Sequence, residues 1–289
     1  MSNIKNKLNE AVENPEFSFP ERIKYAEELA EIGDDRILTF KPNMIHIKGG
    51  EFTMGSSKQE IEKALLEYKH LFTEFEISDV REWFYKEFPA HKAKVNDFFV
   101  SKYLVTNQNY IDYLEDQGQK QSFDIPLKSQ YNHPVKDVTI DQAKEYCIWL
   151  SEKTSRKFRL LTEIEWEWVA MSCEKNFRYP WGNFFNSNFV NTAESGINTT
   201  TAVGVFPQGF SIQGVADLAG NVEEWTDTIY KPYPNGKLIK DRLFKFANGT
   251  YNVLRGGCYS LHGDLCLSKR RHGFYPKYSI TGFRIAETI

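Results

Sequence analysis

Gly214-Val-Ala-Asp-Leu-Ala-Gly-Asn-Val-Glu-Glu-Trp225 is the stretch around which this chain is organised, together with Arg255-Gly-Gly-Cys258 and the closing Gly282-Phe-Arg-Ile-Ala286. Each motif is ordinary by itself, and their order along the chain carries the information. The region that leads into the first motif, from residue 179 onward, is rich in Asn, Thr, Ser and Gly and has weak periodicity. An ordered region with so few apolar side chains needs another source of cohesion, and coordinated metal ions are one.

Length and composition set the first limits. The chain has 289 residues, of which 41% are apolar and 15% aromatic, and this fits one large globular domain with an N-terminal appendage. A formal net charge of -3 gives no field that would attract nucleic acid or a membrane surface, so neither is expected as a partner. The sequence has no apolar signal segment and no run of about 18 apolar residues, so we expect a soluble, cytoplasmic protein. Its four cysteines do not make a disulfide framework.

Further landmarks extend the pattern toward the N-terminus. They are an alternating segment that breaks at a glycine pair (residues 44–56), the helix start Phe158-Arg-Leu-Leu-Thr-Glu-Ile-Glu-Trp-Glu-Trp168, and Tyr179-Pro-Trp-Gly-Asn183. In this order, the landmarks resemble those of the formylglycine-generating enzymes, also called sulfatase-modifying factors, over about residues 44–286. The resemblance implies an α+β fold, a loop-rich variant of the C-type lectin fold.

Two segments lie outside the family pattern. Residues 1–40 predict an N-terminal helical extension, in which residues 19–33 place apolar side chains at helical spacing. This extension either packs on its own domain or docks a protein partner. Residues 41–289 are predicted to form the formylglycine-generating-enzyme-like domain. Within it, residues 57–88 predict a helical insertion where the family has a short loop, and the insertion either covers the site or lies on the surface.

Two capping boxes indicate helix starts in the middle of the chain. Thr139 is followed by Gln142, and Thr162 by Glu165, at the spacing in which both side chains satisfy free amides. The second helix start is also rich in charge: Arg159, Glu163, Glu165 and Glu167. Carboxylates in the first turn of a helix are favoured by the helix dipole, so we interpret this group as structural and not as acid–base machinery.

The resemblance also implies calcium. The family's ligands fall here on Asp217, Gly220, Val222 and Glu224. Carboxylates and backbone carbonyls within one tight loop are hard oxygen donors, which suit calcium. The alternative is that the two acids are solvated loop residues. A second family site falls on Asn191, Thr192, Ser195 and Ile197, where Ser195 replaces an expected aspartate and removes charge.

The family's copper centre is incomplete in this sequence. Formylglycine-generating enzymes bind Cu(I) through two cysteines and use O₂ to oxidise a substrate cysteine. The second cysteine is present as Cys266 and the family histidine as His262, but Leu261 replaces the first cysteine. Two further departures are Cys258, where the family has serine, and Glu223, where it usually has tryptophan. Because leucine offers copper no ligand, the resemblance does not carry the copper oxidase mechanism to this chain.

A rebuilt metal centre is one alternative. Cys258, His262 and Cys266 recur at every fourth residue, with His272 nearby, and such a set of nitrogen and sulfur ligands would suit zinc, iron or copper. The spacing matches no recognised ligand pattern. The other interpretation is that these are separate core and surface residues.

A ligand-binding surface is the last candidate. Cations and aromatic residues lie side by side over residues 269–278, near the expected ligand face. Such a mixture suits an anionic or peptide ligand, and a solvated basic loop is the alternative. The predicted ligand-binding residues are Arg255, Tyr259, Asp264, Arg270 and Arg271. The variable proteins of diversity-generating retroelements also close on Gly-Phe-Arg, but this chain lacks their Asn-rich binding segment.

Two functions follow. The first is a calcium-stabilised regulatory module, without copper oxidase activity, that binds a peptide, a protein or a small molecule. The second is an oxidoreductase whose altered centre on Cys258, His262 and Cys266 acts on a thiol or peptide substrate with O₂. Fold alone does not separate them, because function belongs to the site. Serine hydrolysis is not indicated, because no serine lies in a nucleophile motif.

Overall fold

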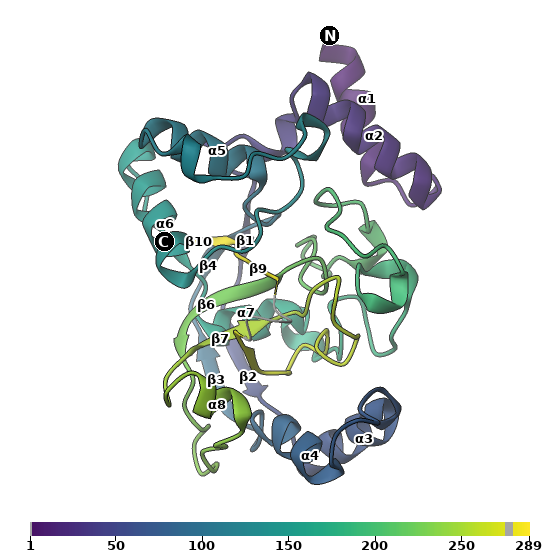
Figure 1. Cartoon of the computed structure of the whole chain (residues 1–289), viewed down its shortest axis with the longest axis vertical. Helices are drawn as coiled ribbons and strands as arrows, with labels where there is room; N and C mark the ends of the chain where they lie inside the picture. The colour runs from purple at the N-terminus through teal and green to yellow at the C-terminus, as the bar shows by residue number, and fades with distance from the viewer. Residues whose placement is uncertain (1, 275–279) are drawn as a thin grey trace.

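The computed structural model describes residues 2–274 and 280–289. Two helical hairpins lie at opposite ends of the molecule, with the strands between them (Figure 1). The N-terminal hairpin consists of α1 (Ser2–Val12) and α2 (Phe19–Ile32). The other consists of α3 (Lys58–Tyr68) and α4 (Ile77–Tyr85), within the segment that departs from the family pattern.

The first four-stranded sheet has the order β1-β4-β10-β5, and all its neighbouring strands are antiparallel. Its strands are β1 (Met44–Ile47), β4 (Phe98–Ser101), β10 (Ile285–Thr288) and β5 (Phe158–Leu160). The last strand of the chain therefore lies in the middle of this sheet and closes the domain against its first strands.

The second four-stranded sheet has the order β8-β7-β6-β9 and carries most of the residues of interest. Its strands are β8 (His272–Gly273), β7 (Asn252–Arg255), β6 (Glu223–Ile229) and β9 (Thr281–Gly282), with β6 and β9 parallel. A separate pair, β2 (Gly50–Met54) and β3 (His91–Val95), brackets the insertion, because Met54 lies opposite His91.

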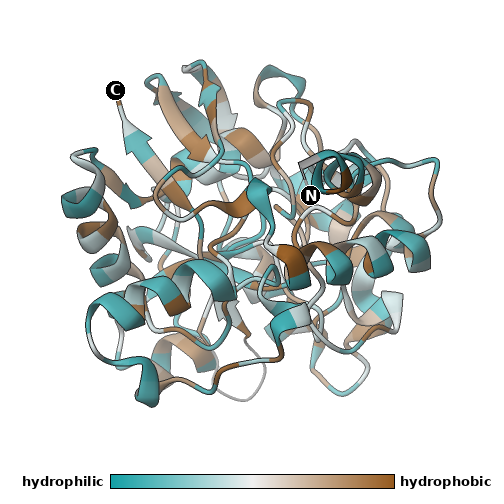
Figure 2. Ribbon diagram, turned by 90° about the horizontal axis from the view of Figure 1, so that it is seen from above, coloured by the Kyte–Doolittle hydropathy of each residue, from teal (hydrophilic) through white to brown (hydrophobic). Residues whose placement is uncertain are grey.

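Four more helices follow in the described part of the chain: α5 (Asn107–Asp116), α6 (Ile140–Thr154), α7 (Glu163–Ala170) and α8 (Arg242–Phe246). Two of them, α6 and α7, start at the capping boxes that the sequence predicts. The capping boxes of Thr139 with Gln142 and of Thr162 with Glu165 are both formed. Hydrophilic and hydrophobic segments alternate along the peripheral helices, as expected for helices with one buried side (Figure 2). Between residues 173 and 209 the chain forms short 3-10 turns instead of longer elements.

The N-terminal hairpin packs on the body of the chain. Val12 and Leu29 are fully buried in a cluster with Val205 and Phe206. The Arg22 guanidinium also donates to the Val205 carbonyl at 2.8 Å. The hairpin therefore packs on its own domain, which is one of the two roles that the sequence allows. Within residues 2–274 and 280–289, no helix combines the length and the apolar composition needed to cross a membrane.

The insertion also packs on the body, and it covers one of the candidate site residues. Ile61 of α3 and Phe84 of α4 are fully buried in one cluster with Tyr179 and Cys266. The hydroxyl groups of Tyr68 and Tyr179 are hydrogen-bonded across the same contact. The insertion therefore contributes to the burial of Cys266, the residue that the resemblance aligns with the family's second copper cysteine.

Candidate functional site

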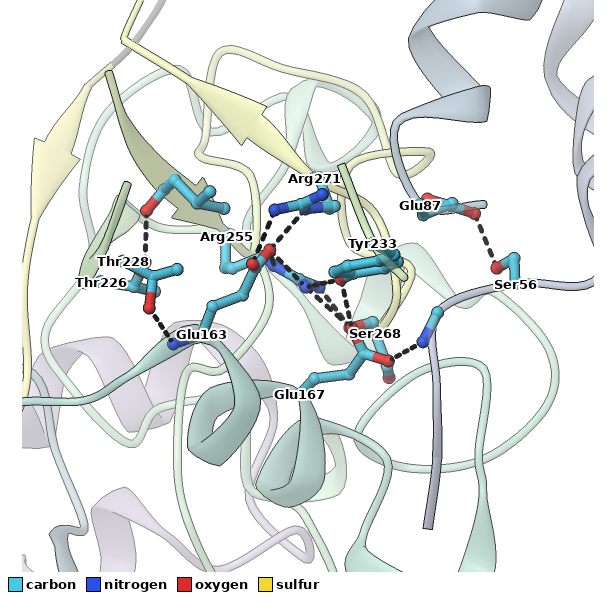
Figure 3. A network of polar contacts seen from close by, with 12 residues as sticks. Ser56, Glu87, Glu163, Glu167, Thr226, Thr228, Tyr233, Arg255, Ser268 and Arg271 are labelled. Atoms are coloured by element: carbon cyan, nitrogen blue, oxygen red, sulfur yellow. Dashed lines mark hydrogen bonds and ion pairs between the residues drawn. The ribbon is translucent and has the colours of Figure 1, made fainter. Parts of the chain in front are cut away.

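Arg255, at the end of β7, lies in a buried ion network (Figure 3). Its guanidinium donates to a Glu163 carboxylate oxygen at 2.7 and 3.0 Å and to Glu167 at 2.7 Å. It also donates to the Tyr233 hydroxyl at 3.2 Å and the Ser268 carbonyl at 3.0 Å. These contacts connect the second sheet to helix α7, and they hold Arg255 inside the protein.

Arg270 and Arg271 hold the insertion in place. Arg271 donates to both oxygens of Glu163, at 2.7 and 2.8 Å, and to the Lys86 carbonyl at the end of α4 at 3.0 Å. Arg270 donates to the Trp83 carbonyl at 3.0 Å, and its guanidinium lies 3.9 Å from the Phe84 ring centroid. Both arginines are buried.

This arrangement differs from the exposed ligand face that the sequence predicts. Arg255, Arg270, Arg271 and Asp264 are all buried, and Asp264 lies 3.4 Å from the Arg270 guanidinium. Only Tyr259 of the predicted group is half-buried, and its backbone N–H donates to the Asn221 carbonyl at 3.1 Å. The physical reason is that the insertion and α7 supply the partners of these cations. The predicted surface segment also includes residues 275–278, which lie outside the described residues.

The buried carboxylates of the network differ in how strongly the arginines stabilise their ionised form. Burial opposes ionisation of Glu163, but Arg271 and Arg255 outweigh it and lower the pKa of this carboxyl. Glu167 has less support, and burial raises its pKa. Glu87, which accepts a hydrogen bond from Ser56 at 2.9 Å, is buried with a pKa raised to about 7 (Figure 3). Glu163 and Glu167 are thus structural, as expected, through ion pairs and not only through the helix dipole.

Asp217 partly fits the calcium site that the family implies. It is buried, and one carboxylate oxygen accepts the Gly204 N–H at 2.8 Å. Burial raises the pKa of Asp217 to about 6; Glu13 and Glu224 add to this effect, and the Gly204 N–H and Arg284 oppose it. A buried carboxylate with a raised pKa would be stabilised by a cation, so Asp217 fits one.

Glu224 fits calcium less well, because both its oxygens bond to Arg284, at 2.6 and 2.8 Å. Glu224 would bind a cation only by sharing its carboxylate with this guanidinium. Gly220 and Val222, whose carbonyls would complete the set, are buried in the same loop.

The second implied calcium loop lies beside the first. The Asn221 N–H donates to the Asn191 carbonyl at 2.8 Å. Within the loop, Ser195 donates to the Thr192 carbonyl at 2.7 Å and to the Asn191 side chain at 3.2 Å. Ile197 is partly buried against the N-terminal hairpin. Ser195 thus places a neutral hydroxyl group where the family has a carboxylate, so this loop offers a weaker cation site than the Asp217 loop.

The cysteines and histidine of the predicted rebuilt centre do not form one ligand set. Cys258 and Cys266 are both fully buried, whereas 45% of the His262 side chain is exposed and its Nδ1 lies 3.2 Å from Glu194. Among residues 2–274 and 280–289, no three His, Cys, Asp or Glu side chains are placed to hold a metal ion. The three-ligand centre predicted from the sequence is therefore not assembled.

The thiols themselves are held in the neutral form. Burial raises the pKa of Cys266 well above its usual value, and Glu194, Asp264 and Cys258 add to this effect. Burial and the charge of Glu223 raise the pKa of Cys258 to about 11. The turn that carries Cys258 depends on Gly256, whose φ is 92°, and a Cβ there would lie 2.8 Å from the Leu218 carbonyl oxygen.

The sequence does not predict that Glu223 and His272 form a pair. Glu223, at the start of β6, is fully buried, and its Oε1 lies 2.6 Å from Nδ1 of His272 in β8. The side chain of His272 is 24% exposed. The available signal was the departure from the family pattern at position 223, where glutamate replaces tryptophan.

Comparison with protein families identifies the group to which the chain belongs. Residues 34–289 match the sulfatase-modifying factor enzyme 1-like domain. The chain is a member of this family. The serine/threonine-protein kinase Pkn1 of Chlamydia trachomatis is 30% identical to it over 92% of the chain and 41% of the kinase. The chain thus spans about two fifths of that relative.

Other members of the sulfatase-modifying factor family differ in activity. The hercynine oxygenase of Mycobacterium tuberculosis is 26% identical over 70% of the chain and 55% of the oxygenase. The inactive C-alpha-formylglycine-generating enzyme 2 of Mus musculus is 29% identical over 66% of the chain and 70% of that protein. The family therefore includes an oxygenase as well as a member described as inactive.

Solved structures confirm the fold class. PvdO from Pseudomonas aeruginosa superposes with a TM-score of 0.63 and 21% identity, covering 88% of the chain and 97% of PvdO. Treponema denticola variable protein 1 superposes with a TM-score of 0.61 and 18% identity, covering 84% of the chain and 94% of that protein. The α+β, formylglycine-generating-enzyme-like variant of the C-type lectin fold expected from the sequence is confirmed.

Proposed function

We propose that this member of the sulfatase-modifying factor family is a regulatory, ligand-binding module without copper oxidase activity. The observation that supports this most directly is the place of Cys266. This thiol is fully buried, in one cluster with Ile61 and Phe84 of the insertion. A copper oxidase needs its metal-binding thiols to meet O₂ and a substrate thiol, and the burial of Cys266 opposes this.

The ligand chemistry supports the same proposal. Two-coordinate Cu(I) needs two thiolates, and Leu261 offers none in place of the first cysteine. The raised pKa of Cys266 and of Cys258 also makes it costly to form either thiolate. Two neutral, buried thiols suit a structural core better than a redox centre.

A regulatory role is supported by the relatives. The chain matches 41% of the length of a serine/threonine-protein kinase, so a similar domain occurs there within a longer protein. One further relative is described as inactive. We propose that the module binds a peptide, a protein or a small molecule for such a partner, and that the N-terminal hairpin contributes to docking. Its four buried, unbridged cysteines are compatible with the cytoplasm.

Calcium is proposed as a structural ion of the module. Asp217 would hold it together with the carbonyls of Gly220 and Val222, and Glu224 would share its carboxylate between the ion and Arg284. The ion would neutralise a buried aspartate that otherwise destabilises the native state in its ionised form. It would thereby stabilise the polar loops on which the site is built.

Elemental analysis tests the proposal. The wild-type protein and Cys266→Ala, both purified without a metal-binding tag, would be measured for copper, iron, zinc and calcium. We expect less than about a tenth of a transition metal per chain in both proteins. About one copper, iron or zinc per chain, lost in Cys266→Ala, would overturn the proposal in favour of the oxidoreductase. Alanine is used because a buried hydroxyl group would add a separate cost to stability.

A further inference from the structure

The hydrogen bond between Glu223 and His272 has a defined donor and acceptor. A carboxylate oxygen only accepts hydrogen bonds, so Nδ1 of His272 carries the proton and donates it to Oε1 of Glu223. In the neutral imidazole, Nε2 is then an acceptor. The His272 side chain is 24% exposed, so the imidazole of this pair reaches the surface of the described chain.

The second carboxylate oxygen of Glu223 is unsatisfied. Oε2 is buried and has no hydrogen-bond partner among the residues that the structure describes. Leaving a charged acceptor without a donor in the protein interior is costly, and such groups in native proteins usually have a role or a missing partner. The pair therefore offers two acceptors and lacks a donor.

The strand register places this pair beside aromatic side chains. His272 lies opposite Leu254 on the neighbouring strand, and Leu254 lies opposite Trp225 on the next. Side chains of directly opposed residues share a face, and so do residues two apart, so Glu223 lies on the same face as Trp225. The ring centroid of Phe274, which is partly exposed, lies 6.0 Å from that of Trp225.

The charged side chains near this pair are themselves paired. Asp264 interacts electrostatically with His272, and its carboxylate lies 3.4 Å from the Arg270 guanidinium. Lys136, which interacts electrostatically with Tyr259, is itself paired with Asp137 at 2.9 Å. Among the described residues, each of these two cations is thus paired with its own aspartate.

Two departures from the family pattern meet at this point. Glu223 stands where the family usually has tryptophan and Cys258 where it has serine, and the charge of Glu223 acts directly on the Cys258 thiol. A tryptophan would fill this position with an aromatic ring and supply a donor. The glutamate instead brings a buried negative charge, and within the described part of the chain its carboxylate is hydrogen-bonded through one oxygen, to His272.

We propose that Glu223 and His272 form a binding site for a protonated nitrogen group, the ammonium or guanidinium of a small molecule or a basic peptide side chain. The ligand donates to Oε2 of Glu223 and to Nε2 of His272, while its apolar stem lies against Phe274 and Trp225. This inference rests on the proposed ligand-binding function and names the chemical class of the ligand.

The test uses argininamide and lysinamide as probes, with norleucinamide as the uncharged control at the side chain. Binding is followed by the imidazole nitrogen resonances in NMR spectra, with His272→Gln used to assign the signal. We expect argininamide, lysinamide or both to shift the His272 signals saturably, and norleucinamide to bind at least tenfold more weakly. Equal shifts with all three probes would overturn the proposal.

Matched variants locate the site. Glu223→Gln keeps the shape and removes the charge, so we expect the dissociation constant to rise at least tenfold. Glu194→Gln removes a carboxylate from the other histidine pair and should change it less than threefold. Glu223→Trp restores the family residue and should abolish binding, which keeps the test valid if Glu223→Gln does not fold. Unchanged affinity in a folded Glu223 variant would show that Oε2 holds only water.

The failure of this inference is distinguishable from failure of the proposed function. A thiol-bound transition metal in the elemental analysis would remove the proposed function whatever the amides do. A metal-free protein that binds none of the three amides would leave the module proposal standing and overturn the ligand class. The two measurements are independent because Cys266 is not part of the Glu223 and His272 pair.

Discussion

Glu223 and Glu224 are adjacent on β6, both buried, and differ in their side-chain contacts. Both oxygens of Glu224 bond to Arg284, at 2.6 and 2.8 Å, whereas Glu223 has one bond to His272 and one oxygen without a partner among the described residues. Successive residues of a strand point to opposite faces, so one glutamate belongs to the interior network and the other to the face of Trp225. The two glutamates are therefore equally buried but differ in role. The difference is that both oxygens of Glu224 have hydrogen-bond partners, whereas one oxygen of Glu223 has none among the described residues.

The face of Glu224 is rich in compensated charge. Arg255 lies opposite Glu224 and bonds to Glu163 and Glu167, and Arg271 bonds to Glu163 as well. Such networks add little net stability relative to well-packed apolar groups, but they become costly when one partner is removed. The other face carries the charge of Glu223, which His272 supports through one oxygen. This contrast can be tested by breaking each face in turn.

Removal of Arg255 should give the largest effect. Arg255→Met leaves Glu163 and Glu167 buried with fewer partners, so we expect a loss of about 3–5 kcal/mol in the free energy of unfolding. Urea denaturation measures it. The control is Lys136→Met, which breaks an exposed pair and should cost less than about 0.5 kcal/mol. A loss for Arg255→Met as small as that of the control would contradict the network's structural role.

The adjacent glutamates provide the sharpest comparison. Glu224→Gln leaves the Arg284 guanidinium buried without a countercharge and should cost about 2–4 kcal/mol. Glu223→Gln removes an under-compensated charge and should change stability by less than about 1 kcal/mol. The same denaturation experiment on both variants measures the difference. Equal losses would mean that Glu223 is as much a part of the fold as Glu224.

Asp217 should make stability depend on pH. Its pKa is about 6 in the folded chain, against an ordinary value of 3.8, so the folded chain binds more protons than the unfolded chain between these values. Stability from this group therefore falls as pH rises from about 4 to 6, by on the order of 2 kcal/mol. The measurement is the difference between wild type and Asp217→Asn in chelator, from pH 4 to 7. A pH-independent difference would show that Asp217 is not protonated more readily in the folded chain.

Calcium should offset the loss of stability that ionised Asp217 causes. If Asp217 holds the ion, calcium at about 100 times its dissociation constant stabilises the native state by about 2.7 kcal/mol, and a chelator lowers Tm by a few degrees. Asp217→Asn should lose most of this response, whereas Asp137→Asn, an exposed control, should keep it. A Tm that does not change with chelator in the wild type would overturn the calcium assignment.

The sequence by itself determined the helix starts and the order of the family motifs along the chain. The capping boxes of α6 and α7 involve residues three apart, and the family landmarks are short motifs whose order survives in one chain, so both were readable. The departures from the family pattern at Leu261 and Glu223 are visible in the sequence for the same reason. The leucine argues against a copper site.

Only the tertiary structure decided which charges meet. Arg271 finds the Lys86 carbonyl 185 residues away, and His272 finds Glu223 49 residues away. A run of cations has the same appearance in a sequence whether it faces solvent or holds an insertion in place. Its partners are brought together by the packing of distant elements, which obeys no short-range spacing rule. For that reason the sequence predicts a ligand-binding segment at the basic run and does not predict the contact between Glu223 and His272.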